Sequence, residues 1–279
     1  MGETSLLVFS LCMQAAIGIM LFSFITQMVF KDKQFKMAAV TTAVLAVIGV
    51  FASFAHLGHP LSALNVLGRF GQSWLSTEAV LSGVFAGVAI LYVLFLYLRA
   101  NDRNLSVGLS GIGSVLGLVV VLSMAKVYTV SSVPIWQGAN TFVDFYATTI
   151  ALGALLFLIA SINELKDVSK KLFGYSILAA VVLQAASAVP HVLGLNEMGS
   201  AAQGSLQILN GMSTLVWAKW LLILGGAGVA LYPASARVKE DARPNVNIFI
   251  TAGAALVIGQ IIGRYLFYAA LVVMNVGLM

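Results

Sequence analysis

Long apolar runs separated by short polar segments divide this chain. A helix that crosses ~30 Å of hydrocarbon at 1.5 Å per residue needs about 20 apolar residues. Eight stretches meet that length and predict these spans: Ser5–Phe30, Met37–Ala55, Leu75–Leu98, Leu105–Tyr128, Thr141–Ile162, Leu172–Leu193, Thr214–Tyr232 and Val246–Leu271. The runs are continuous and do not alternate, which excludes a β-barrel. The pattern predicts an all-α polytopic bundle of eight transmembrane helices, a single integral-membrane domain over residues 1–279.

Composition supports the same fold class. The chain is 60% hydrophobic and 9% charged, with a mean hydropathy of +0.99. Soluble domains are about half apolar and about a quarter charged, so a soluble enzyme or a nucleic-acid-binding protein is excluded. The single cysteine, Cys12, lies inside an apolar run. The chain therefore has no intrachain disulfide and no cysteine set for zinc or an iron–sulfur cluster, and we expect no metal site.

The basic residues indicate the orientation. Connections after spans one, three, five and seven contain eleven of them: Lys31, Lys33, Lys36, Arg99, Arg103, Lys166, Lys170, Lys171, Arg237, Lys239 and Arg243. On the opposite side Arg69 lies in a connection, with Lys126 and Lys219 near helix ends. The side rich in Lys and Arg is normally cytoplasmic, so both termini are predicted outside. All four tryptophans fall at the outer face, as an interfacial belt would: Trp74, Trp136, Trp217 and Trp220.

Two connections on the outer side differ in composition from simple turns. Between His56 and Trp74, a proline at 60 and leucines repeating at three predict a short interfacial helix that ends near Gly68. The segment Gly194–Ser213 is predicted to be a long, polar and nearly uncharged loop. It suits a protein partner, a lid over a cavity, or ordinary solvent exposure, and these alternatives stay open.

Ionisable residues inside apolar spans need an explanation, since each costs on the order of 2.5–3.5 kcal/mol on insertion scales. Five lie inside or at the edge of spans: Glu78, Lys126, Asp144, Lys219 and Arg264. Given the predicted topology, all five fall in the outer half, as do the three histidines, His56, His59 and His191. The inner half of the spans looks nearly featureless. Any chemistry is therefore expected near the outer face.

Each candidate also has a structural explanation. Lys126 and Lys219 could extend their ammonium groups to lipid head groups, and Asp144 is interpreted mainly as a cap for span five. His191 and Arg69 could be interfacial in the same way.

Arg264 and Glu78 are harder to explain by packing. Arg264 follows Gly259-x-x-x-Gly263, a small-residue face that brings a neighbouring helix close. Its depth implies a buried counter-charge or a water-filled cavity. We expect a functional role for both residues.

Function classes differ in where they place such groups. A transporter uses a midplane site and paired repeats, and neither is evident here. A haem needs facing histidines, whereas His56 and His59 flank one turn beside Pro60 and cannot sandwich one iron. Pairing of either with His191 leaves a cytochrome b type anchor open. A quinone site near one face fits best, because it needs an apolar slot, polar groups for the head group and a base.

A set of motifs supports the quinone interpretation. In chain order they are His56-Leu-Gly-His-Pro60-Leu-Ser-Ala-Leu-Asn65, Arg69, Ser73-Trp-Leu-Ser-Thr-Glu78, Lys126-Val-Tyr128, Val133-Pro-Ile-Trp136 and Gly259-Gln-Ile-Ile-Gly263-Arg264-Tyr-Leu-Phe-Tyr268. Over essentially the whole chain, this order resembles the membrane anchor subunit of dimethyl sulfoxide reductases.

The resemblance implies a haem-free anchor in the bacterial cytoplasmic (inner) membrane that oxidises menaquinol in anaerobic respiration. It implies two partners, an iron–sulfur subunit carrying four clusters and a molybdopterin catalytic subunit. The catalytic subunit selects the terminal acceptor, which this chain does not determine.

The resemblance also implies roles for residues. His56 and Glu78 match the family's quinol-site histidine and glutamate; His56 would hydrogen-bond a quinol hydroxyl and Glu78 would take a proton and release it outward. Arg264 and Lys126 would favour developing negative charge on the ring. Further head-group contacts are expected from Arg69, Ser73 and Tyr128.

One position departs from the family pattern. Gln260 stands where the family has glutamate, one turn before Arg264. We therefore expect Arg264 to lack an adjacent carboxylate.

Overall fold

The computed structural model describes residues 2–31, 33–55, 68–99, 102–165, 170–235 and 246–274. All regular elements within these ranges are helices, which confirms the all-α prediction. In chain order they are α1 Gly2–Val29, α2 Lys36–Ala55, α3 Trp74–Leu98, α4 Arg103–Thr129, η2 Pro134–Trp136, α5 Ala139–Ala160, α6 Lys171–Gly194, η3 Leu195–Glu197, α7 Ser200–Gly211, α8 Ser213–Ser235 and α9 Val246–Ala269.

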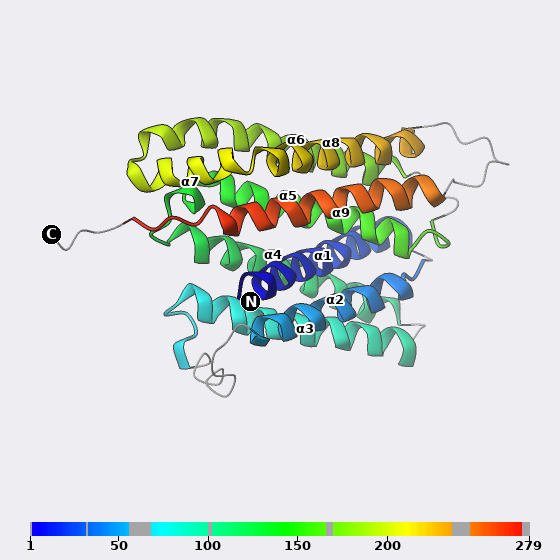
Figure 1. The fold of residues 1–279 in the computed structure, drawn as a ribbon. Coiled ribbons are helices and arrows are strands. Elements are labelled where there is room, and N and C mark those ends of the chain that lie inside the picture. Colours follow the sequence, from blue (N-terminus) through cyan, green and yellow to red (C-terminus); the bar gives the residue numbers. More distant parts are fainter. Residues whose placement is uncertain are drawn as a thin grey trace.

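Eight of these helices are long and apolar enough to cross a membrane. They are α1 to α6, α8 and α9, and their bounds agree within a few residues with the spans predicted from the sequence. They lie side by side as one bundle (Figure 1). Many large apolar side chains on its surface are exposed, as a lipid-facing surface requires.

The bundle has two distinct ends (Figure 1). The terminal end carries the start of α1, the end of α9, and the short helices η2, η3 and α7. The basic end carries the connections after α1, α3 and α5, with Lys31, Lys33, Arg99 and Arg103 among their residues. The start of α1 and the end of α9 therefore lie at the same end of the bundle, as an even number of spans requires.

Helix α1 lies between several others and contacts α2, α4, α5 and α9. Its crossing with α5 depends on two glycines. A Cβ atom at Gly18 would lie 2.1 Å from the Thr149 carbonyl oxygen, and one at Gly153 would lie 2.3 Å from the Gly18 Cα. Only glycine fits at this backbone-to-backbone contact, which is the close helix approach expected of small residues in membranes.

The Gly259 and Gly263 face packs on α8. A Cβ atom at Gly259 would lie 2.6 Å from the Ile223 side chain, and one at Gly263 would lie 2.9 Å from the Lys219 Cε. The predicted close helix approach at this motif is confirmed. It fixes the rotation of α9 and thereby the side from which Arg264 projects.

The predicted loop Gly194–Ser213 is wrong in one respect, because most of it is helical. It forms η3 and the twelve-residue helix α7. Helix α7 buries its small side chains Ala201, Ala202 and Ser205, which gives the segment an inner face. The helix predicted between Pro60 and Gly68 lies almost entirely outside the described residues.

Candidate functional site

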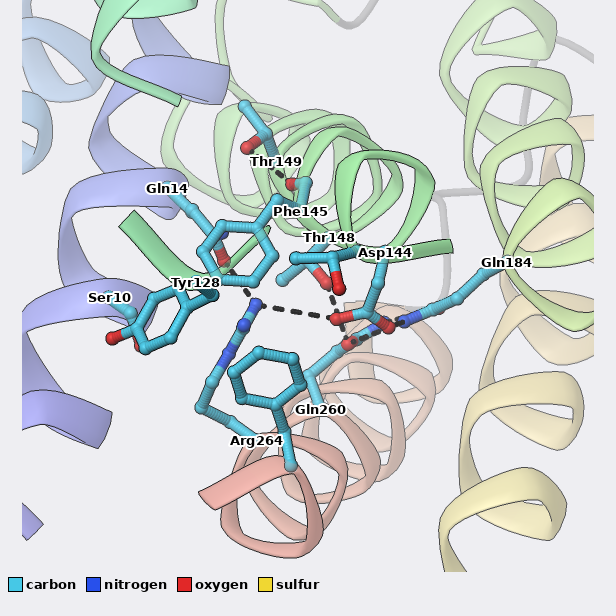
Figure 2. Close-up of polar contacts among 12 residues, drawn as sticks. Ser10, Gln14, Tyr128, Asp144, Phe145, Thr148, Thr149, Gln184, Gln260 and Arg264 are labelled. Atoms are coloured by element: carbon cyan, nitrogen blue, oxygen red, sulfur yellow. Dashed lines mark hydrogen bonds and ion pairs between the residues drawn. The ribbon is translucent and has the colours of Figure 1, made fainter. Parts of the chain in front are cut away.

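A buried ion pair joins α9 to α5 near the terminal end. Arg264 Nη2 lies 3.6 Å from Asp144 Oδ2, and their side chains are 1% and 18% exposed (Figure 2). Of the two alternatives expected for Arg264, a buried counter-charge or a water-filled cavity, the structure shows the counter-charge. The interpretation of Asp144 as a helix cap is wrong: Gly138 occupies the N-cap position of α5, and Asp144 lies further along the helix, where it faces α9.

Two glutamines hold the carboxylate in place. Gln184 of α6 donates from Nε2 to Asp144 Oδ1 at 2.6 Å (Figure 2). Gln184 and Gln260 also exchange amide hydrogen bonds at 3.1 and 3.3 Å, and Thr148 Oγ1 donates to Gln260 Oε1 at 3.0 Å. The expectation that Arg264 lacks a carboxylate because of Gln260 is therefore corrected. The carboxylate comes from the neighbouring helix, and Gln260 orients it through Gln184.

The other side of Arg264 faces α1 and two aromatic rings. Its Nη2 donates to Gln14 Oε1 at 3.0 Å, and its guanidinium carbon lies 3.9 Å from the Phe145 ring centre and 5.4 Å from that of Phe267. Within the described residues, Arg264 Nε, Arg264 Nη1 and Gln14 Nε2 are buried without a hydrogen-bond partner. Such donors are rare in native proteins, and each calls for an explanation such as a catalytic role or a bound water or ion.

Two tyrosine hydroxyls lie beside this ion pair. Tyr128 of α4 and Tyr268 of α9 are hydrogen-bonded through their hydroxyls at 3.0 Å. The Tyr268 hydroxyl also lies 3.4 Å from Ser10 Oγ of α1. The Tyr128 ring makes edge or tilted contacts with four aromatic side chains: Trp136, Phe145, Phe267 and Tyr268. An apolar aromatic wall therefore surrounds a small set of hydroxyl groups.

Glu78 lies in the second turn of α3 and is 5% exposed. Its carboxylate lies within electrostatic range of both Tyr128 and Tyr268. In the part of the chain described, no basic side chain lies within 4.0 Å of it, since Arg264 pairs with Asp144 instead. Within the described residues, Glu78 is thus a buried carboxylate without a basic partner, close enough to two phenol groups to interact with them electrostatically.

The structure places other predicted residues outside this arrangement. Lys126 Nζ lies over the rings of Trp74 and Phe142, at 5.8 and 5.5 Å from their centres. Arg69 is exposed in the turn before α3, and Ser73 is the N-cap residue of α3. His56 lies outside the described residues.

Two further candidates have local partners. Lys219 Nζ lies 4.6 Å from the centre of the Trp220 ring. His191 donates from Nε2 to the Ile135 carbonyl oxygen at 2.9 Å, which ties α6 to η2.

Sequence reasoning missed the neutral polar residues of the site. Ser10, Gln14, Thr148 and Gln184 each interrupt an apolar run, and that interruption was the available signal. A prediction built on ionisable groups alone does not include these neutral side chains.

The basic end also differs from its prediction, because its spans are not featureless. Gln27 of α1 is buried, donates to the Tyr92 hydroxyl at 2.6 Å and accepts from Ser110 Oγ at 3.2 Å. Arg103 Nη2 donates to the Gln27 carbonyl oxygen at 3.2 Å. This second polar network links α1, α3 and α4.

Comparison with known proteins gives a consistent result over most of the sequence. The protein is 29% identical over 212 residues to the anaerobic dimethyl sulfoxide reductase subunit YnfH of Escherichia coli (strain K12), covering 75% of its own length and 72% of the relative. It is 26% identical over 211 residues, at the same coverages, to the C subunits of the anaerobic dimethyl sulfoxide reductases of Haemophilus influenzae and Escherichia coli. The profile of the DMSO reductase anchor subunit (DmsC) matches residues 1–270. The protein therefore belongs to the DMSO reductase anchor subunit family.

Proposed function

We propose that this anchor subunit oxidises menaquinol at the polar site of the terminal end. We call this site the terminal cluster and define it by six residues: Gln14, Glu78, Tyr128, Asp144, Arg264 and Tyr268. The observation that carries the proposal is that unsatisfied hydrogen-bond donors and an unpaired carboxylate are buried in the same part of the bundle. Among the described residues, buried donors of Arg264 and Gln14 have no acceptor, Glu78 is a buried carboxylate with no basic side chain within 4.0 Å, and Tyr128 and Tyr268 interact with both Glu78 and Arg264.

Quinol oxidation requires both kinds of group. The reaction releases two electrons and two protons, and the two ring oxygens change from hydroxyl donors to carbonyl acceptors. Glu78 accepts a hydroxyl proton, as a positioned general base does. The free N–H groups of Arg264 and Gln14 donate to a ring oxygen and favour the negative charge that develops there.

The aromatic wall suits the remainder of the ring. Tyr128, Phe145 and Phe267 offer apolar faces, and ligand sites are typically apolar with a few placed polar groups. Asp144, which is held by its glutamine partners, restrains the Arg264 side chain. The free donors of Arg264 therefore have the same orientation before the substrate binds as after it. In this proposal His56 remains a head-group ligand, whereas Arg69, Ser73 and Lys126 lie outside the terminal cluster and act on the substrate only at longer range.

Sidedness follows from charge. The basic end faces the cytoplasm by the positive-inside rule, so the terminal cluster lies near the outer face of the inner membrane and releases its protons there. Cys12, the single cysteine, lies within α1, so the electrons pass to clusters held by an iron–sulfur subunit and then to a molybdopterin subunit. The relatives are named as parts of dimethyl sulfoxide reductases, and this anchor serves the same type of complex without haem.

Glu78→Gln tests the proposal. The substitution keeps volume and hydrogen bonding but removes the base, so menaquinol-driven turnover of the assembled complex should fall roughly 10²-fold or more. A dye that reduces the partner subunits directly should still support full turnover. Glu197→Gln is the matched control, because Glu197 is an exposed carboxylate at the same end.

Unchanged menaquinol turnover in an assembled Glu78→Gln complex would overturn the assignment. Loss of the dye-driven reaction as well would indicate that Glu78 is needed for assembly and not for the chemistry.

A further inference from the structure

A small cavity lies at the basic end, between the end of α1 and the start of α4. Its volume is about 60 Å³. Three of its lining residues are cationic, Lys31, Lys33 and Arg103, and Gln27 and Ser106 add polar groups. No carboxylate is among the described residues that line it.

The cations are held by carbonyl groups and not by acids. Arg103 donates to the Gln27 carbonyl oxygen at 3.2 Å, and Lys33 Nζ donates to the Glu164 carbonyl oxygen. These bonds position two positive charges and do not neutralise them. Glu164 also carries a carboxylate, whose Oε2 is buried without a hydrogen-bond partner, but within the described residues it forms no ion pair with Lys33 at 4.0 Å or less. Lys31 is exposed at the edge of the same cavity.

Neighbouring charged groups do not neutralise the excess positive charge of Lys31, Lys33 and Arg103. Asp102 caps α4, where its side chain accepts from the Leu105 N–H at 3.2 Å. Lys36 Nζ lies over the Tyr97 ring at 5.4 Å. Across the described ranges, no ion pair within 4.0 Å involves Lys31, Lys33 or Arg103. Three like charges around one small cavity repel each other, and a bound anion would relieve that repulsion.

The rear wall is pre-formed. Gln27 is fixed by Tyr92 and Ser110, and it is 3% exposed. The first turn of α4 supplies Arg103 and Ser106, and the positive end of a helix dipole adds to the attraction for an anion. The site therefore combines fixed cations, a polar wall and a cavity.

Position and size select the class of anion. The span of α1 ends at Val29 and that of α4 begins at Arg103, so the cavity lies at the level of lipid head groups. A bound water needs roughly 10–15 Å³ of such cavity volume, so about 60 Å³ has room for about four to five heavy atoms, the size of a phosphate group. Basic pockets between transmembrane helices at such a level bind phospholipid head groups.

We propose that this cavity binds the phosphate of an anionic phospholipid, with Lys31, Lys33 and Arg103 as its ligands. The bound lipid ties the 30–35 connection to the first turn of α4. The site is independent of the quinol proposal, because it lies at the opposite end of the bundle.

Binding to the purified full-length protein in detergent tests this site. The ligands added are phosphatidylglycerol, phosphatidylcholine and inorganic phosphate, with native mass spectrometry and thermal unfolding as readouts. Phosphatidylglycerol should bind and raise the Tm, and the other two should do neither at equal concentration. The double variant Lys31→Gln/Arg103→Gln should bind phosphatidylglycerol about tenfold more weakly or worse, since two of the three cationic donors to the phosphate are lost.

The matched control is Lys36→Gln/Arg99→Gln, which removes the same charge at the same end but outside the cavity. An equal loss in this control would show general surface attraction and overturn the proposal. Unchanged binding in the cavity variant would overturn it too, and tight binding of inorganic phosphate would refute a lipid ligand. If the double variant fails to fold, Lys31→Gln alone decides, because Lys31 is exposed.

Discussion

The two ends of this bundle both bury polar side chains inside apolar helices, yet they do so differently. At the basic end, Gln27, Tyr92 and Ser110 are neutral and satisfy one another, and the charges lie at the mouth of the cavity. At the terminal end, Asp144 and Arg264 bring charge into the bundle itself, and donors of Arg264 are left open.

This difference distinguishes buried polar groups that stabilise helix packing from buried polar groups that serve a reaction. A neutral pair that satisfies itself contributes modestly to helix association, on average about 0.6 kcal/mol in membranes. A buried ion pair gives no such net benefit, because its desolvation cost can exceed the attraction between the charges. The terminal cluster is therefore better explained by chemistry than by stability, and three sets of substitutions test that interpretation.

Arg264→Gln is expected to have the largest effect. Menaquinol-driven turnover should fall by about 10²- to 10³-fold, because the positioned cation is lost. The Tm should also fall, since removing one partner of a buried pair typically costs about 3–5 kcal/mol, less here because Asp144 is partly exposed. Adding Asp144→Asn should restore the Tm but not the turnover. Recovery of both in the double variant would show that the pair is only structural.

Two glutamines on α1 allow the ends to be compared by one substitution. Gln14→Leu removes a partner of Arg264 and should lower menaquinol turnover about tenfold, which corresponds to about 1.4 kcal/mol. Gln27→Leu should leave turnover unchanged and lower the Tm, since an interhelical hydrogen bond in a membrane contributes at most about 1.7 kcal/mol to stability. Equal losses of turnover in both variants would remove the distinction between the ends.

Lys126→Gln should have the smallest effect. Its ammonium group faces the rings of Trp74 and Phe142 and acts on the terminal cluster only at longer range. We expect turnover to fall by no more than about threefold and stability by about 0.5–1 kcal/mol, the usual range for an exposed cation–π contact. Steady-state turnover and a thermal scan would measure both, and a loss as large as that of Arg264→Gln would place Lys126 inside the site.

Burial in hydrocarbon also explains which features of the structure the sequence predicts and which it does not. The spans were predictable because hydrocarbon thickness sets helix length, and the need of Arg264 for a counter-charge followed from its depth. The identity of that counter-charge did not follow. Asp144 lies 120 positions earlier, and the two meet only because glycine contacts fix the rotation of α9.

Helix rotation is what hydropathy leaves undetermined. A helix that is apolar on every side carries no stripe to show which face turns inward. Gln14 and Gln184 are therefore recognisable as unusual, but only the packed bundle shows that Gln14 contacts Arg264 directly and that Gln184 reaches it through Asp144. Conversely, the sequence predicts a loop where α7 forms, because the buried face of α7 is built from small residues that give little hydropathy signal.

The contact between Gly18 and Gly153 has a consequence for how the protein is made. These glycines lie 135 positions apart, so α1 enters the membrane long before α5 exists. At about 5–20 residues per second, synthesis of that interval takes roughly 7 to 27 s. During this time the face of α1 that ends against α5 must rest against lipid or an insertion factor. The order of synthesis thus makes the arrival of α5 the step that closes the centre of the bundle, and it delays formation of the terminal cluster until α9 follows.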